Sequence, residues 1–347
     1  MEQQGEHKRR IRYNGTHPHT FNEKYKELNP DKYQEDVEKI IKQGKTPAGM
    51  HIPICVNEIL KFLQIAPNQI GLDATLGYGG HTQKMLECLN GKGHIYAIDV
   101  DAQELKKTQE RLQTLGFDKD ILTVKKLNFA SIDEVAPTQK FDFILADLGV
   151  SSMQIDNPER GFTFKRDGAL DLRLDQSTGE TAGQRLQKLN YPEIVNMLTE
   201  NADEPYAEQI ARGILRTYNK GGAIDTTKQL YQIIEDALNF LPPNERKDTI
   251  KKSCQRTFQA LRIEVNSEFE ALNTFLEKLP NVLKSGGRVA ILTFHSGEDR
   301  LVKKAFKAHL AQGEYSEVAR DVIRPSAQEC NQNPRAHSTK MRWAIKA

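Results

Sequence analysis

The sequence has few cysteines, no long apolar run and no marked excess of charge of one sign. Its four cysteines lie far apart and form no CxxC pair: Cys55, Cys88, Cys254 and Cys330. We therefore expect four reduced thiols, with neither a disulfide framework nor a bound metal. No apolar run approaches the roughly 20 residues of a membrane span, and the polar start MEQQGEHKRR lacks the apolar stretch of a secretory signal. These absences predict a cytoplasmic protein without a membrane partner.

The chain has 347 residues, of which 38% are hydrophobic and 28% charged, with 49 Lys and Arg against 47 Asp and Glu. This composition is too apolar for a disordered chain. It indicates a soluble globular protein, either one large domain with an insertion or two domains. The near-neutral total hides basic stretches at residues 246–262 and 320–347. Each stretch could meet a polyanion, and a solvated face is the alternative.

Short apolar runs alternate with helical patterns after residue 50. The runs GLDATL, HIYAIDV, FDFILADLGV and RVAILTFH have the composition and length of buried strands. Their alternation predicts an α/β fold with a parallel sheet, whose ligands bind outside the carboxyl ends of the strands. After residue 150 the strand pattern stops and helical patterns follow, which indicates an insertion. We expect an N-terminal extension at 1–50, a main domain split between 51–155 and 255–347, and an inserted helical domain at 156–254.

Several helix boundaries are predicted from capping residues. Asn190, Asp203 and Thr226 would open helices of the insertion, and Ser267 with Glu270 would form a capping box for the next helix. The Ser-Gly-Gly at 285–287 is expected to end that helix, and Ser296 to cap the one after the last apolar run.

A glycine-rich turn follows the first predicted strand, in the sequence Asp73-Ala-Thr-Leu-Gly-Tyr-Gly-Gly-His81. Gly77, Gly79 and Gly80 would let a ligand approach the backbone, with an ordinary tight turn as the alternative. Asp99 ends the second strand about 20 residues later, where a carboxylate can accept hydrogen bonds from both hydroxyls of a ribose. Its alternative role is to cap the next helix, which Asp101 can do instead.

The turn favours a nucleoside without phosphates over NAD, because Thr82 stands where the dinucleotide fingerprint requires a third glycine. S-adenosylmethionine is such a ligand, and Asp73 could meet its ammonium group. The adenine would lie near Asn128 and Phe129, with Phe129 as a plain core residue the equal alternative.

The predicted strand FDFILADLGV leads into the sequence DLGVSSMQ, which brings Asp147, Ser151 and Ser152 to the ligand edge. Hydrogen-bond acceptors at this place suit the exocyclic amine of a nucleobase as the target. Hydrogen bonds to the protons of the amine help its delocalised lone pair to become nucleophilic. The alternative is that Asp147 and Ser151 only cap a turn. His295, after the last apolar run, completes the candidate catalytic set, with a structural histidine as its alternative.

Taken together, these residues resemble one family, the small-subunit ribosomal RNA cytosine-N4 methyltransferases, also called MraW or methyltransferase H. The resemblance covers residues 51–347 and includes the runs HIPICVNEIL, DATLGYGGHT, LADLGVSSMQIDNPERGFTF, RTFQALRIEVNSEFEAL, GGRVAILTFHSGEDRLVK and NPRAHSTKMR. It implies a Rossmann-like class I methyltransferase fold, S-adenosylmethionine as the methyl donor, and a decoding-centre cytidine as the target.

The family's cofactor positions fall on Gly79, Gly80, His81, Asp99, Phe129, Asp147 and Gln154, of which His81 and Gln154 come from the resemblance alone. The implied partner is 16S ribosomal RNA, within the small ribosomal subunit or an assembly intermediate, and a homodimer stays open. The candidate RNA contacts are basic residues: Lys251, Lys252, Arg256, Arg262, Arg335, Lys340 and Arg342.

The chain departs from the family pattern in three places. It has Lys252-Ser-Cys-Gln255 where His-Pro-Ala-Thr is usual, Gly297 where Leu is usual, and Leu172 and Leu174 where Met is usual. Two alternatives therefore stay open: an RNA-binding or ribosome-assembly factor that has lost the reaction, and a methyltransferase for another nucleic-acid amine.

Overall fold

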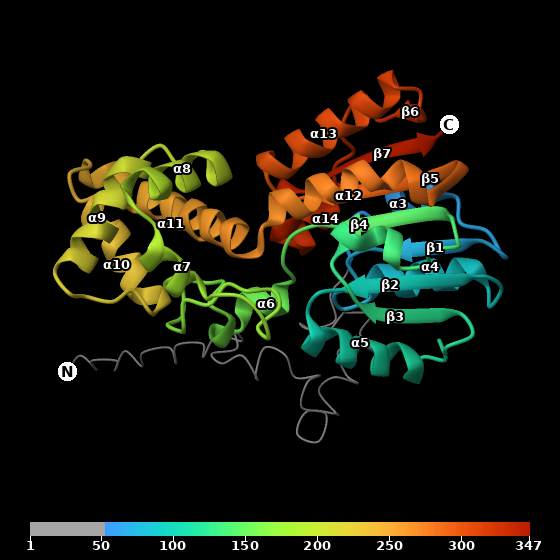
Figure 1. Cartoon of the computed structure of the whole chain (residues 1–347), viewed down its shortest axis with the longest axis horizontal. Coiled ribbons are helices and arrows are strands. Elements are labelled where there is room, and N and C mark those ends of the chain that lie inside the picture. Colours follow the sequence, from blue (N-terminus) through green and yellow to red (C-terminus); the bar gives the residue numbers. More distant parts are fainter. Residues whose placement is uncertain (1–52) are drawn as a thin grey trace, which may run out of the picture. The chain divides into compact units, whose positions relative to one another are not determined.

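The computed structural model describes residues 53–347, apart from the side chains of Ser152, Gln332 and Pro334. The extension predicted at 1–50 lies outside the described residues. A seven-stranded sheet has the order β3-β2-β1-β4-β5-β7-β6 (Figure 1). The five parallel strands are β1 Ile70–Asp73, β2 His94–Asp99, β3 Leu122–Lys126, β4 Phe141–Asp147 and β5 Leu283–Thr293.

The last two strands, β6 Tyr315–Val318 and β7 Lys340–Lys346, were not predicted from the sequence. Strand β7 lies antiparallel between β5 and β6. The short α14 Ala327–Gln332 and η4 Pro334–Ser338 join the two strands. The predicted α/β fold with a mostly parallel sheet is therefore confirmed, and an antiparallel pair completes one edge.

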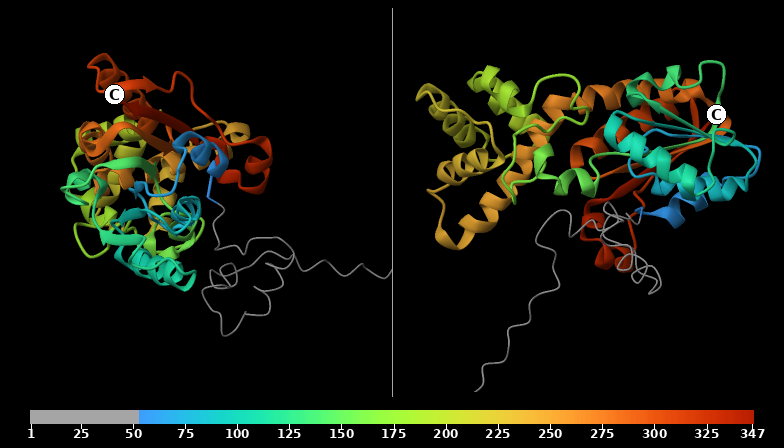
Figure 2. Two further views of the ribbon diagram at one scale, coloured as in Figure 1. Left: turned by 90° about the vertical axis from the view of Figure 1, so that its right-hand side faces the viewer. Right: turned by 90° about the horizontal axis from the view of Figure 1, so that it is seen from below.

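The parallel strands are buried on both faces, which is why their sequences are continuous apolar runs. In β4, Ile144 and Ala146 pack with η2 Phe129–Glu134, α12 Glu268–Val282 and α13 Ser296–Ala311. Phe143 and Leu145 point to the other face and pack with helices α3 Val56–Leu63, α4 Gly80–Leu89 and α5 Ala102–Thr114. Figure 2 shows helices on both sides of the sheet.

The insertion between β4 and α12 has its own hydrophobic core, formed by buried residues from Leu170 to Leu261. Its elements are α6 Ser152–Asp156, η3 Pro158–Arg160, α7 Ala182–Lys188, α8 Tyr191–Ala202, α9 Ala207–Asn219, α10 Thr227–Ala237 and α11 Pro243–Asn266. Helix α11 runs unbroken through residues 254 and 255, where the sequence placed a domain boundary. The hydrophobic core of these helices includes residues of α11 up to Leu261. Within residues 53–347, no helix combines the length and the apolar composition that crossing a membrane requires.

Of the four helix starts predicted between residues 190 and 267, two are confirmed and two are wrong. Asn190 and Thr226 cap α8 and α10 through capping boxes. Asp203 instead ends α8 in the left-handed conformation, with φ of 49°. Ser267 is also left-handed, with φ of 47°, and its side chain caps nothing, because it sits in a sharp joint between α11 and α12. Residues 285–287 lie inside β5 at an irregular register rather than ending α12, which stops at Val282.

Candidate active site

The carboxyl ends of β1, β2 and β4 bring three acids to one edge of the sheet. Asp73, Asp99 and Asp147 are the last residues of these strands. Because the strands are parallel neighbours, the three side chains lie close enough for Asp73 to raise the pKa of both other carboxyls. The structure therefore brings together three acids that the sequence placed at strand ends.

Asp99 holds the glycine-rich turn in place. The amide of Gly77 donates to its Oδ2 at 2.8 Å and the amide of Asp101 to its Oδ1 at 2.9 Å. Burial raises the pKa of Asp99 to about 6, although these two hydrogen bonds oppose the shift. A carboxylate has about four acceptor sites, so Asp99 can still accept from a ligand's hydroxyls. It does not cap helix α5, because Asp101 does.

Asp73 is buried and partly occupied by its own neighbours. The Thr82 hydroxyl donates to its Oδ2 at 2.6 Å and the Thr75 amide to its Oδ1 at 3.1 Å. Burial raises the pKa of Asp73 despite these bonds. Thr82, the residue that counts against a dinucleotide site, thus serves as a donor to this carboxyl.

Different constraints favour glycine at the three positions of the turn. Gly77 and Gly79 have φ of 49° and 75°, in the region that favours glycine. At Gly79 a Cβ would also lie 2.7 Å from the Thr108 side chain of α5. At Gly80 a Cβ would lie 3.2 Å from Pro53. Close packing explains Gly79 and Gly80, and the expected contact of Gly77, Gly79 and Gly80 with a cofactor stays a prediction.

Asp147 is the acid with an unused acceptor. The His81 ring places Nδ1 3.5 Å from Asp147 Oδ2, while its Nε2 lies 2.9 Å from the Ile54 carbonyl. The other oxygen, Oδ1, is covered and has no hydrogen-bond partner among the described residues, although 28% of the side chain is exposed. Burial raises the pKa of Asp147 to about 6, with Asp73 and Glu298 adding to the shift and His81 opposing it. Such an unpaired, buried carboxylate at a strand end is typical of a functional site.

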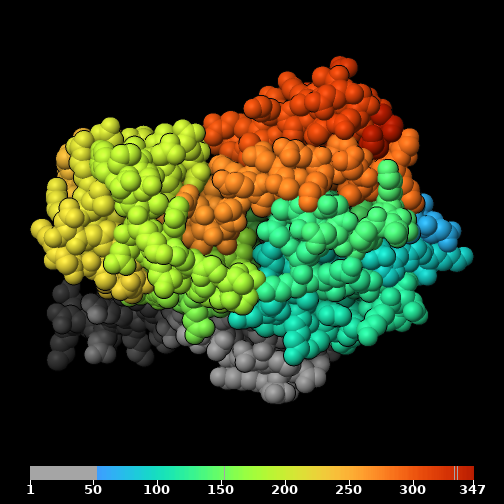
Figure 3. Space-filling model, in the orientation of Figure 1, coloured from blue at the N-terminus to red at the C-terminus, as the bar shows by residue number. Residues whose placement is uncertain are grey.

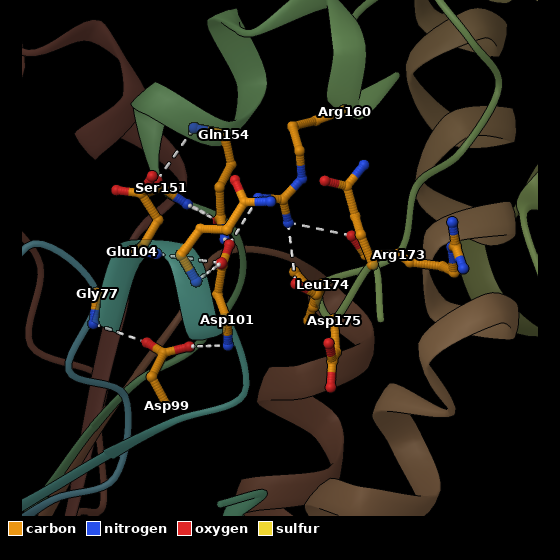
Figure 4. A network of polar contacts seen from close by, with 12 residues as sticks. Gly77, Asp99, Asp101, Glu104, Ser151, Gln154, Arg160, Arg173, Leu174 and Asp175 are labelled. Atoms are coloured by element: carbon orange, nitrogen blue, oxygen red, sulfur yellow. Dashed lines mark hydrogen bonds and ion pairs between the residues drawn. The ribbon is translucent and has the colours of Figure 1, made fainter. Parts of the chain in front are cut away.

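A polar network leads from Asp99 into the insertion (Figure 4). Asp101, whose amide binds Asp99, accepts at Oδ2 from Gln154 Nε2 at 2.9 Å and from Arg160 Nη1 at 2.6 Å. Gln154 also forms a capping box with Ser151, the residue before α6. Arg160 donates further to the carbonyls of Arg173 and Leu174, at 3.1 and 2.9 Å.

This network joins the predicted ribose acceptor to the segment after β4. Ser151 caps helix α6, and Gln154 donates to Asp101. Ser152 is the first residue of α6. Arg160, whose side chain is 5% exposed, was missed from the sequence, where it stood out only as part of the ERGF run.

Phe129 and Asn128 both have structural roles. The Phe129 ring packs edge-to-face on Phe275, with ring centroids 5.1 Å apart, and is half-buried. The Asn128 side chain caps η2 by accepting from the Ala130 amide at 2.9 Å. The core alternative for Phe129 is thus observed, and a stacked adenine on its exposed part stays a prediction.

His295 begins helix α13 beside this edge. Its Nδ1 accepts from the Glu298 amide at 3.4 Å, and its Nε2 lies 3.1 Å from Glu298 Oε1. His295, not Ser296, therefore caps the helix. Although burial alone would raise it, the pKa of Glu298 is lowered by His295 and by Arg262. His295 therefore has a structural role as the partner of Glu298, and the sequence did not identify this partner.

Arg262 is part of the same buried cluster. Its guanidinium donates to both oxygens of Glu268 at 2.8 Å and lies 4.0 Å from Glu298, with 13% of the side chain exposed. Although burial opposes it, the pKa of Arg262 is raised by Glu268. Side-chain atoms of Glu268, His295 and Glu298 that could bind a metal ion lie within 4.8 Å of one another. The Arg262 guanidinium already places a positive charge beside these carboxylates.

The predicted RNA contacts differ in their exposure. Lys251 and Lys252 are exposed on α11, and Arg256 is half-buried on the same helix. Arg342 is 6% exposed and donates to Asp299 at 2.6 Å, so neither Arg342 nor Arg262 presents a free guanidinium group to a phosphate. Those two expectations are corrected. The other two predicted contacts are partly exposed and already ion-paired: Lys340 to Asp299 at 3.1 Å and Arg335 to Asp156 at 3.2 Å.

The whole described chain is similar to one group of known proteins. A sequence profile of the MraW methylase family matches residues 48–347. Ribosomal RNA small subunit methyltransferase H 1 of Lachnoclostridium phytofermentans is 65% identical over 342 residues, which are 98% of this chain and 93% of that protein. Ribosomal RNA small subunit methyltransferase H 2 of Alkaliphilus metalliredigens is 63% identical over 98% of this chain and 97% of its own length.

A more distant relative matches a smaller share of this chain. Ribosomal RNA small subunit methyltransferase H of Caldicellulosiruptor saccharolyticus is 36% identical over 85% of this chain and 99% of its own. The two more similar relatives align with nearly all of this chain. Most of the N-terminal extension therefore has a counterpart in them.

Proposed function

Because this chain belongs to the MraW methylase family, we propose that it transfers the methyl group of S-adenosylmethionine to the N4 amine of a cytidine in 16S ribosomal RNA, at the decoding centre. The observation that carries the proposal is Asp147 Oδ1, a buried carboxylate oxygen without a partner among the described residues, at the end of β4. The relatives' printed names supply the small-subunit ribosomal RNA.

The three strand-end acids fit the methyl donor. Asp99 keeps acceptor sites free for ribose hydroxyls, and Asp73 and Asp147 offer negative charge for a cationic ligand. When bound, S-adenosylmethionine supplies an electrophilic methyl group on a sulfonium. A cation beside Asp147 would also favour the ionised form of this carboxyl, whose pKa burial raises to about 6.

In this proposal Asp147 orients the target amine. Its free Oδ1 accepts a hydrogen bond from the amine, while Thr75 Oγ accepts from the Asp147 amide at 2.6 Å and fixes the backbone there. The hydrogen bond helps the delocalised lone pair of the amine to become nucleophilic. The His81 ring lies 3.5 Å from the other oxygen, and it lowers the pKa of this carboxyl against the effect of burial.

Lys251 and Lys252 stay proposed contacts to the RNA backbone, because both are exposed on α11. Arg256, on the same helix, is the third.

The substrate class is tested by methyl transfer to defined nucleic acids. Purified protein with methyl-labelled S-adenosylmethionine is given unmodified 16S ribosomal RNA, small ribosomal subunits, transfer RNA and DNA, and the product is identified by nucleoside mass spectrometry. We expect N4-methylcytidine in ribosomal RNA or small subunits alone. Labelling confined to DNA or transfer RNA would overturn the proposed substrate, and binding of RNA without methyl transfer would support an assembly factor instead.

A further inference from the structure

Helix α13 carries a stripe of cations that none of the sites above uses. Arg300, Lys303, Lys304 and Lys307 follow one another at spacings of three, four and seven residues from the first, which places them on one face of a helix. All four are exposed. We call these four residues the α13 stripe. At about 1.5 Å per residue it is about 10 Å long.

No acid of the same helix neutralises the α13 stripe. Glu298 and Asp299 are 4% and 9% exposed and pair inward, Glu298 with His295 and Asp299 with Arg342. Val302 and Phe306 form the buried face of the helix. Acids of α13 itself therefore do not reduce the positive charge of its outward face.

The stripe is almost free of partners in the described part of the chain. Lys303, Lys304 and Lys307 make no hydrogen bond or ion pair with another residue of 53–347. Arg300 approaches Asp203 at 3.3 Å, but both side chains are more than half exposed. An exposed pair of this kind contributes little, so Arg300 also remains available to an external anion.

The stripe starts beside the candidate active site. Helix α13 begins directly after His295, and Glu298 in its first turn acts electrostatically on Asp147. The strand before the helix, β5, pairs Leu292 with Asp147. From this edge the helix leads outward, and Figures 1 and 3 show it as an outer border of the molecule that is open to solvent in that view.

We propose that the α13 stripe binds the phosphate backbone of the substrate RNA next to the target nucleotide, as a track separate from the lysines of α11. The proposal rests on the RNA-directed function proposed above. A stripe about 10 Å long reaches a few neighbouring phosphates of one strand. The three lysines of the stripe are point charges without a rigid fork, and such charges suit sequence-independent backbone contacts, which position an RNA without reading its bases.

The test is a triple substitution, Lys303→Gln, Lys304→Gln and Lys307→Gln, beside a matched control. The control removes three exposed lysines elsewhere, Lys106→Gln, Lys107→Gln and Lys119→Gln, on α5 and the loop after it. Both variants change the net charge equally. A third variant, with arginine at the three stripe positions, keeps the charge.

Binding to 16S ribosomal RNA and to small ribosomal subunits is measured between 50 and 200 mM salt, with S-adenosylmethionine affinity and thermal melting as checks. For the stripe variant we expect Kd to rise about 10- to 100-fold and the slope of log K against log salt to fall by about 2, at about 0.7 per phosphate. KM for RNA should rise more than kcat falls. The arginine variant and the control should stay near the parent.

Equal losses in the stripe and control variants, or an unchanged Kd and salt slope, would overturn the inference. The parent protein separates this failure from that of the proposed function. If the parent neither binds nor methylates ribosomal RNA, the function itself is wrong. If the parent methylates RNA and the stripe variant does so with unchanged KM, only the role proposed for the α13 stripe is wrong.

Discussion

Replacing Asp147 by Asn should make the protein more stable and less active. The carboxyl has a pKa raised from 3.8 to about 6, mainly by burial. A rise of about 2 units corresponds to about 3 kcal/mol at about 1.36 kcal/mol per unit. Since 28% of the side chain is exposed, solvent screening reduces this figure, and we expect a gain of about 1 to 2 kcal/mol in the free energy of unfolding at neutral pH.

The pH dependence gives this prediction its sign. The raised pKa means that the folded parent favours the protonated acid, so this contribution to its stability is present below about pH 4 and lost as pH rises to about 6. Asn does not ionise. The stability difference between variant and parent should therefore be near zero at pH 4 and complete above pH 6.

The assay combines denaturation at several pH values with single-turnover methylation of RNA. Turnover by Asp147→Asn should fall at least about tenfold, since the amide lacks the charge that orients the amine, with a smaller change in cofactor affinity. Asp120→Asn, at an exposed position before β3, should change neither quantity. If Asp147→Asn turns over RNA like the parent, the amine acceptor must be sought among Ser151, Ser152 and His295. A stability difference that does not change with pH would refute the raised pKa of the Asp147 carboxyl.

Three other substitutions test the surroundings of the site. Asp99→Ala should weaken S-adenosylmethionine binding by about tenfold or more in calorimetry, because a charge-assisted contact contributes about 1.5 to 3 kcal/mol; unchanged affinity would remove Asp99 from the ribose site. Arg160→Met should cost about 3 to 5 kcal/mol of unfolding free energy, because it leaves the buried carboxylate of Asp101 unpaired. Arg185→Met is the control: it breaks a pair with Glu264 in which 41% and 25% of the side chains are exposed, and it should cost less than about 1 kcal/mol. Equal costs would contradict the structural role of Arg160. Gly297→Ala should lower the melting temperature, because a Cβ there would lie 2.6 Å from the Phe269 ring, at a cost of about 1 kcal/mol, and Phe269→Leu in the same chain should restore part of the loss.

The sequence predicted the site where the chemistry depends on strand ends. A parallel sheet places Asp73, Asp99 and Asp147 at one edge, and each lies directly after a run of buried apolar residues. Asp101 was also recognisable as a helix cap, because capping depends on residues close in the chain. Local patterns thus located the acids and the turn.

Contacts across the insertion could not be predicted in the same way. Arg160 and Asp101 are 59 residues apart, and nothing in the periodicity of either segment indicates the other. Arg262 was expected on a polar helix face, but its guanidinium turns inward to Glu268 and Glu298. A basic residue at helical spacing has the same pattern whether its partner is a phosphate or a buried carboxylate, so only the tertiary structure decides.

Site-mapped nucleoside mass spectrometry of small-subunit ribosomal RNA, from cells with and without the protein, tests whether this chain methylates one cytidine of that RNA. Loss of the protein should remove the N4-methyl group from a single cytidine, and purified protein with S-adenosylmethionine should restore it on the isolated small subunit. Ribosomal RNA in which no modified cytidine changes when the protein is lost would contradict the account.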